Sequence, residues 1–193
     1  MQISFEFEGG DHMKQFLKTY YEFSDYQIAQ LEYLFKTILS EISKMLLMGI
    51  LFRHELDLYI ISLLALCLLR TSTGGLHCKT YLICLLSSAL YMIMAIKILP
   101  LIPVLPIIKI ILLLPCIIIN YWVGPVTSDV HLPLTEDIIR SGRMRAASLI
   151  LLFTVTMVII PENKYTISIF WIVIIHSLQL IIAKIRKKGV NKL

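Results

Sequence analysis

The chain has 193 residues, of which 58% are hydrophobic and 16% are charged, whereas ordinary globular chains carry about 25% charged residues. Its apolar residues form several long runs that a soluble core of this size could not bury, so a soluble enzyme, a secreted disulfide domain and a disordered tail are excluded. The Lys and Arg residues (18) outnumber the Asp and Glu residues (13) and flank the apolar runs, as membrane topology predicts, so nucleic acid is not an expected partner.

Residues 1–36 are predicted to form an interfacial amphipathic arm. Ser24 followed by Gln27 is typical of a capping box, which marks the start of a helix. From Ile28 onward apolar residues recur at helical spacing, and the sequence becomes fully apolar after Met45. Such a helix is expected to run along the membrane surface and then enter the bilayer.

Six apolar segments follow within a predicted membrane domain, residues 37–183. They lie at 37–52, 56–69, 81–99, 101–123, 146–160 and 165–183. Spanning normally takes about 20 residues, so the shorter segments fit a thinned bilayer, and four full spans with two partial ones fit almost as well. Pro103, Pro106 and Pro115 predict kinks in the fourth segment. The predicted fold class is an all-α integral membrane protein with about six transmembrane or partial helices.

The distribution of basic residues predicts the orientation of the chain. Most of them fall in the arm, in the polar segment 70–80, in the loop 124–145 and in the basic tail 184–193. The opposite side receives only Arg53, Lys97 and Lys164. Because cytoplasmic loops carry the excess of Lys and Arg, both termini and both polar stretches are predicted to be cytoplasmic in a multi-pass protein of the cell membrane.

The polar segment 70–80 carries the strongest chemical signal. Gly74 and Gly75 break helix continuity, and the next helix is expected to begin near residues 79–81. Cys84 then lies within about one turn of the helix N-terminus, where the helix dipole favours the reactive thiolate, and an imidazolium at His77 favours it further. A Cys–His pair is a known way of activating a nucleophile.

Helix geometry places a condition on this pairing. Seven residues of continuous helix separate the Cα atoms of His77 and Cys84 by about 10.5 Å, so His77 must lie in a turn that folds back over the helix start. Cys78 is the rival nucleophile, but adjacent side chains on a regular backbone diverge. From the residues alone two other interpretations stay open: a cysteine in an apolar helix is usually a small hydrophobe, and a zinc ion could be bound by His77, Cys78 and Cys84.

The order Arg70, Gly75, His77 and Cys84 resembles the accessory gene regulator protein B family of Gram-positive bacteria. The chain length, the number of apolar segments, the basic tail and the polar loop at 124–133 are similar as well. The resemblance implies a membrane cysteine endopeptidase that needs no cofactor or metal, with Cys84 as nucleophile, His77 as base, and Arg70, Gly74 and Gly75 in supporting positions. It implies an AgrD-like precursor peptide as partner, whose C-terminal tail is removed and whose remainder is cyclised to a thiolactone or lactone autoinducing peptide.

Further residues are assigned roles around this site. The acidic tail of the precursor is expected to be attracted by basic residues, namely Lys79, Arg140, Arg143 and Arg145. A carboxylate that orients His77 could come from Asp129, Glu136 or Asp137, although Glu136 and Asp137 fit better in the first turn of a helix that begins near Thr135. Within the last apolar segment, His176 and Gln179 are expected to bond a neighbouring helix.

Other functions remain compatible with the sequence. A non-enzymatic small peptide transporter or membrane scaffold would use the proline-containing segment 101–123 to line a peptide path, and zinc-dependent hydrolysis is a third interpretation. Membrane lipid is an expected partner, and a homodimer is a compatible assembly for a membrane protein of this size. The substitution Cys84→Ser separates transport, which survives it, from thiol catalysis, which does not.

Overall fold

A computed structural model describes residues 24–74, 80–126 and 135–190. Within these residues the secondary structure is helical, apart from an isolated backbone bridge between Gly74 and Val126. The chain divides into two compact units, Met1–Met48 and Gly49–Leu193, and each is described by itself.

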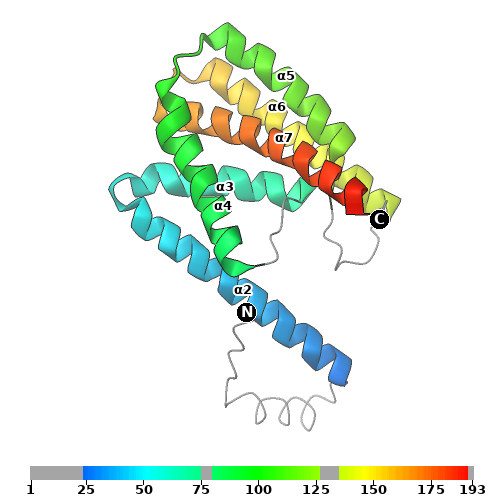
Figure 1. Cartoon of the computed structure of the whole chain (residues 1–193). Helices are drawn as coiled ribbons and strands as arrows, with labels where there is room; N and C mark the ends of the chain where they lie inside the picture. Colours follow the sequence, from blue (N-terminus) through cyan, green and yellow to red (C-terminus); the bar gives the residue numbers. More distant parts are fainter. Residues whose placement is uncertain (1–23, 75–79, 127–134, 191–193) are drawn as a thin grey trace. The chain divides into compact units, whose positions relative to one another are not determined.

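The helices of the described residues are labelled as in Figure 1. The long helices are α2 (Asp25–Leu51), α3 (Leu56–Thr73), α4 (Tyr81–Ile93), α5 (Pro106–Val123), α6 (Glu136–Ile159) and α7 (Lys164–Val190). Short helical turns precede α3 and follow α4, namely η1 (Arg53–Glu55), η2 (Met94–Ile98) and η3 (Leu99–Leu101).

Five helices of the described residues are long and apolar enough to cross a membrane. They are Arg53–Thr73, Tyr81–Leu101, Pro106–Val123, Glu136–Ile159 and Lys164–Arg186. Within the described residues the all-α prediction is confirmed, and the five helices are consistent with the predicted multi-pass membrane protein. The predicted first span at 37–52 forms the second half of α2, which is not among these five.

The start of α2 confirms the predicted capping box. The backbone N–H of Ser24 donates to Gln27 Oε1 at 2.9 Å, and the backbone N–H of Gln27 donates to Ser24 Oγ at 3.3 Å. This reciprocal pair satisfies two donors that a helix start otherwise leaves open. From there α2 continues without a break to Leu51, and Phe35 and Leu46 of its apolar stripe are exposed, as contact with lipid requires.

Two helices begin elsewhere than the apolar segments predicted. α5 begins at Pro106 instead of residue 101, because Pro103 and Pro106 withhold backbone donors and Pro106 itself fits the first helical position. α6 begins at Glu136, within the stretch assigned to the loop 124–145, and carries Glu136 and Asp137 in its first turn. The first residues of α6 are polar, so an apolar window detects only the part of the helix that faces lipid.

The second unit is built around α7. α5 and α6 pack against each other and against α7, side by side in Figure 1, and α3 packs on α6 and α7. Leu69, Leu113, Ile150 and Phe170, one from each of these helices, are completely buried at the centre. η2 carries most of the contact between the α4 region and the other helices, and α4 adds a bond from the Tyr91 hydroxyl to the Ile172 carbonyl oxygen at 2.8 Å.

Ion pairs connect the helices at one end of this unit. They join η1 to η2, the start of α3 to α7, and the start of α5 to the α6–α7 connection. The pairs are Lys97–Glu55 at 2.5 Å, Lys164–Asp57 at 2.5 Å and Lys109–Glu162 at 2.6 Å. Lys97 and Lys109 thus have carboxylate partners at this end.

Candidate functional site

Cys84 lies in the first turn of α4, as its spacing predicts. The helix follows Thr80, whose backbone is extended (φ −121°, ψ 146°), and the backbone N–H of Cys84 donates to the Thr80 carbonyl oxygen at 3.1 Å. The side chain is a half-buried thiol. The N–H groups of residues 81–83 come before the first intrahelical bond and point toward the helix start, so they favour negative charge near Cys84.

The other border of the polar segment is the end of α3 at Gly74. Gly74 has φ +72°, a left-handed conformation that L side chains rarely adopt, and its N–H donates to the Arg70 carbonyl oxygen at 2.8 Å. The predicted helix break at Gly74 is therefore confirmed. The N–H of Val126 donates to the Thr73 carbonyl oxygen at 2.9 Å. The backbone is therefore paired at the two places, Gly74 and Val126, after which the polar stretches 75–79 and 127–134 follow in the sequence.

The first turns of α6 pack against the end of α3 and bond the backbone that follows α5. Gly142 lies so close to α3 that an added Cβ would meet the Ser72 carbonyl oxygen at 2.6 Å. Arg143 Nε donates to the Gly124 carbonyl oxygen at 2.8 Å. Arg143 thus has a structural partner in the backbone between α5 and α6.

A buried polar cluster connects α3, α5 and α7 beside this junction. His176 Nε2 and Thr73 Oγ1 are 2.8 Å apart, and Arg70 Nη2 donates to Gln179 Oε1 at 3.4 Å. The expectation that His176 and Gln179 bond a neighbouring helix is confirmed. Asn120 of α5 was not singled out from the sequence, although a lone amide in an apolar run was the available signal.

Three buried atoms of this cluster have no hydrogen-bond partner among the described residues. They are Arg70 Nε, Asn120 Oδ1 and His176 Nδ1. The amide nitrogen of Asn120 is bonded, since it donates to Cys116 O and to Ser177 Oγ, both at 2.8 Å. The Thr73 hydroxyl gives its single proton to Leu69 O at 2.9 Å, so His176 Nε2 carries the donor proton and Nδ1 is a bare acceptor.

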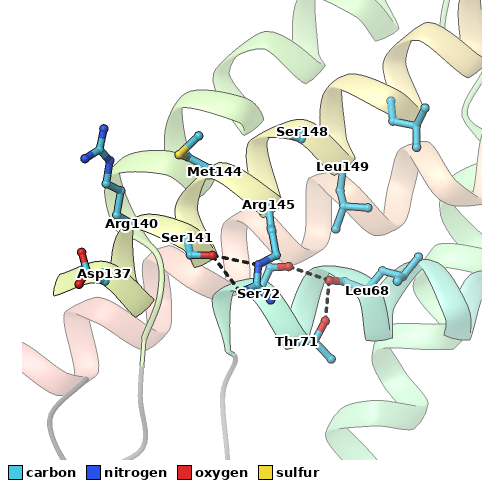
Figure 2. A pocket seen from close by; sticks show the side chains of 11 residues that line it. Leu68, Thr71, Ser72, Asp137, Arg140, Ser141, Met144, Arg145, Ser148 and Leu149 are labelled. Atoms are coloured by element: carbon cyan, nitrogen blue, oxygen red, sulfur yellow. Dashed lines mark hydrogen bonds between the residues drawn. The ribbon is translucent and has the colours of Figure 1, made fainter. Parts of the chain in front are cut away.

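An open groove of about 740 Å³ runs between α3 and α6 (Figure 2). Arg140 and Arg145, two of the predicted substrate-binding residues, line it together with Asp137. Arg145 donates to Ser141 Oγ through Nε at 3.2 Å and through Nη2 at 2.8 Å. Of the predicted basic residues that the structure describes, Arg140 and Arg145 therefore line this groove, and Arg143 contacts the backbone of Gly124.

Several predicted site residues lie outside the described part of the chain. They are Gly75, His77, Cys78, Lys79 and Asp129. The pairing of His77 with Cys84 therefore stays a prediction. No group of three or more His, Cys, Asp or Glu side chains that could hold a metal occurs within residues 24–74, 80–126 and 135–190.

Comparison with known sequences gives the family. The sequence model of accessory gene regulator B matches residues 9–180. The chain belongs to the accessory gene regulator B family. The match runs from the N-terminal arm through the polar segment and Cys84 to α7, including His176, which confirms the resemblance indicated by Arg70, Gly75, His77 and Cys84.

A curated relative agrees with this membership of the accessory gene regulator B family. It is a putative AgrB-like protein of Clostridium beijerinckii, 36% identical over 69 residues. The alignment covers 35% of this chain and 35% of that protein, so the chain spans about a third of the relative's length. No solved structure matches the chain.

Proposed function

We propose that this member of the accessory gene regulator B family is a membrane cysteine endopeptidase that processes an AgrD-like quorum-sensing propeptide. The position of Cys84 carries the proposal: a half-buried thiol in the first turn of α4, directly after the polar segment that leaves the end of α3. A cysteine that only filled space would not need a helix start, whereas a nucleophile gains from the positive end of the helix dipole there.

In the proposed reaction Cys84 attacks the carbonyl carbon at the cleavage point. His77 takes the thiol proton and gives it to the departing amine, the C–N bond breaks, and the C-terminal tail leaves with a new amino terminus. The remaining peptide is held on Cys84 as a thioester. A cysteine or serine within the peptide then attacks this thioester, loses its proton to His77, and closes a thiolactone or lactone ring while the Cys84 thiol is restored.

The described residues supply two further contributions. The N–H groups at the start of α4 are suited to stabilise the oxyanion that forms on the attacked carbonyl. Leu82, Ile83 and Leu86 around Cys84 are exposed and apolar, so lipid or the bound peptide covers them. Such a setting keeps water away from the thioester, which favours ring closure over hydrolysis.

The proposed site lies on the cytoplasmic side. The ends of α3 and α5 and the start of α6 meet at one end of the unit, and Lys184 of α7 donates to the Trp122 carbonyl oxygen there at 3.2 Å. The same end carries Arg140 and Arg145, which is the charge bias of cytoplasmic loops. Attraction of the precursor's tail by Lys79, Arg140, Arg143 and Arg145 stays a prediction.

The proposal is tested in liposomes with the AgrD-like precursor. Wild type, Cys84→Ala, His77→Ala and the control Cys67→Ala, which removes a half-buried thiol from α3, are compared by mass spectrometry. We expect the released tail and a peptide adduct on Cys84 with wild type and Cys67→Ala, and neither with Cys84→Ala. Unchanged cleavage by Cys84→Ala refutes the proposed nucleophile, and the absence of cleavage by wild type favours the transporter or scaffold.

A further inference from the structure

The groove between α3 and α6 changes character along its length. Its polar end is formed by Asp137, Arg140, Ser141 and Arg145. The opposite end is apolar and is lined by Leu68, Leu149 and Leu152, with Met144 between the two ends. Figure 2 shows Arg140 and Arg145 on the first turns of α6 and Leu149 further along the same helix, facing Leu68 of α3.

The depth of these residues along α6 matches the layers of a bilayer. Arg145 directly precedes Ala146, where the apolar part of α6 begins, and Arg140 lies about 7.5 Å earlier at 1.5 Å per residue. The headgroup layer on each side of the hydrocarbon is roughly 5–8 Å thick. Both guanidinium groups therefore lie at headgroup depth, while Leu149 and Leu152 lie at hydrocarbon depth.

The charges at the polar end are not neutralised within the described residues. Arg140 forms no hydrogen bond or ion pair there, and Arg145 bonds the neutral hydroxyl of Ser141. Asp137 shares the groove but forms no ion pair with either arginine in this part of the chain. Two guanidinium groups are thus available to a phosphate, which arginine binds through paired N–H donors.

We infer that this groove is a binding site for an anionic glycerophospholipid. Its phosphate is bound by Arg145 and by Arg140, whose side chain points away from α3 in Figure 2 and turns toward the phosphate on binding, and an acyl chain follows Leu149 and Leu152 along α6 against Leu68. A zwitterionic lipid would leave the arginines without net countercharge, and an acidic peptide would leave the apolar wall uncovered. Basic pockets between transmembrane helices at the charged side of a membrane are suited to such headgroups.

Lipid titration monitored by native mass spectrometry tests this site, and the result does not depend on whether the protein processes a peptide. The full chain in detergent micelles is titrated with phosphatidylglycerol or phosphatidylcholine, and the bound lipids are counted. We expect preferential binding of phosphatidylglycerol. Loss of two basic contacts in Arg140→Gln/Arg145→Gln is expected to weaken it about thirtyfold, or about 2 kcal/mol, at about 1 kcal/mol per basic residue.

Two variants separate this site from general membrane electrostatics. Arg186→Gln/Lys187→Gln removes the same charge from the C-terminal part of α7, outside the groove, and is expected to keep the affinity. Ser148→Trp fills the groove without a change of charge and is expected to lower the affinity. An equal loss in the α7 control, or full affinity in Ser148→Trp, overturns the inference.

Two competitors distinguish the lipid from its fragments and from a peptide. Glycerol phosphate, which carries a phosphate but no acyl chain, is expected not to displace the lipid. Displacement by it identifies a site for anions alone. A hexaglutamate peptide that binds in an Arg140- and Arg145-dependent manner, without any preference for phosphatidylglycerol, assigns the groove to acidic peptides and overturns the inference.

Discussion

Replacement of His176 by leucine is expected to separate stability from activity. The ring of His176 is 1% exposed and connects α7 to Thr73 in the last turn of α3, directly before the polar segment leaves at Gly74. Leucine has a similar volume but no donor for Thr73 Oγ1 and no bare acceptor. The substitution therefore removes one interhelical bond and also removes the unpartnered Nδ1.

The two contributions oppose each other. An interhelical hydrogen bond in a membrane protein contributes about 0.6 kcal/mol on average and at most about 1.7 kcal/mol. A buried polar atom without a partner costs about 1–3 kcal/mol, and His176→Leu relieves that cost. We expect the free energy of unfolding of His176→Leu to stay within about 1 kcal/mol of wild type or to rise.

Activity is expected to respond differently, because the bond positions the end of α3. Under the proposed function, loss of the hydrogen bond between His176 and Thr73 lets the end of α3 shift. A 1 Å misplacement at a reaction centre can cost about 10²-fold in rate. We expect His176→Leu to lower the maximal rate of precursor cleavage at least tenfold with a smaller change in KM. His176→Gln, whose amide can donate to Thr73, is expected to recover most of the rate.

Unfolding in bicelles by added SDS, followed by the fluorescence of Trp122 and Trp171, measures the stability, and cleavage of the precursor in liposomes measures the rate. A loss of stability above about 2 kcal/mol in His176→Leu would refute the assignment of Nδ1 as an unpartnered atom. An unchanged cleavage rate would refute the positioning role. The latter result leaves the proposed role of Cys84 untouched, since that role is tested by its own variant.

Two glycine positions give further predictions. Gly74→Ala places a side chain at φ +72° against the carbonyl of the paired segment, so we expect a loss of 1–3 kcal/mol or so together with lower cleavage, whereas a stable and fully active variant would contradict the described end of α3. Gly142→Ala forces a Cβ to 2.6 Å from a carbonyl oxygen of α3 and is expected to cost about 1–3 kcal/mol. Its control, Gly49→Ala, meets side-chain atoms no closer than 3.9 Å and is expected to stabilise α2 by about 0.5–1 kcal/mol in the same SDS titration.

Local signals in the sequence determined the class of the protein and several helix boundaries. Long apolar runs require lipid or burial, so the multi-pass helical class followed from composition. The capping pair Ser24 and Gln27, the break at Gly74 and the position of Cys84 one turn into α4 depend on residues close to one another in the chain. The structure agrees with each of these because caps and turns are satisfied by their own neighbours.

Hydropathy alone was less reliable where a helix leaves the lipid. The apolar window at 146–160 missed the first turns of α6, because backbone hydrogen bonding continues into a polar sequence that a lipid scale assigns to a loop. The window at 37–52 was predicted to be a separate span, yet it lies almost entirely in a single helix that starts at Asp25 and is not among the five that are long and apolar enough to cross a membrane. Hydropathy measures preference for lipid, whereas helix length depends on caps and breaks.

Only the tertiary structure decided which polar groups meet. His176 and Thr73 are 103 residues apart in the chain, Gln179 and Arg70 are 109 apart, and Asn120 and Ser177 are 57 apart. The sequence marked His176 and Gln179 as intramembrane polar groups that need partners, because lipid offers none. Their partners depend on how the side-chain ridges of one helix pack into the grooves of its neighbour. The axial position of one helix relative to another is a property of the packed bundle and cannot be read from any one segment.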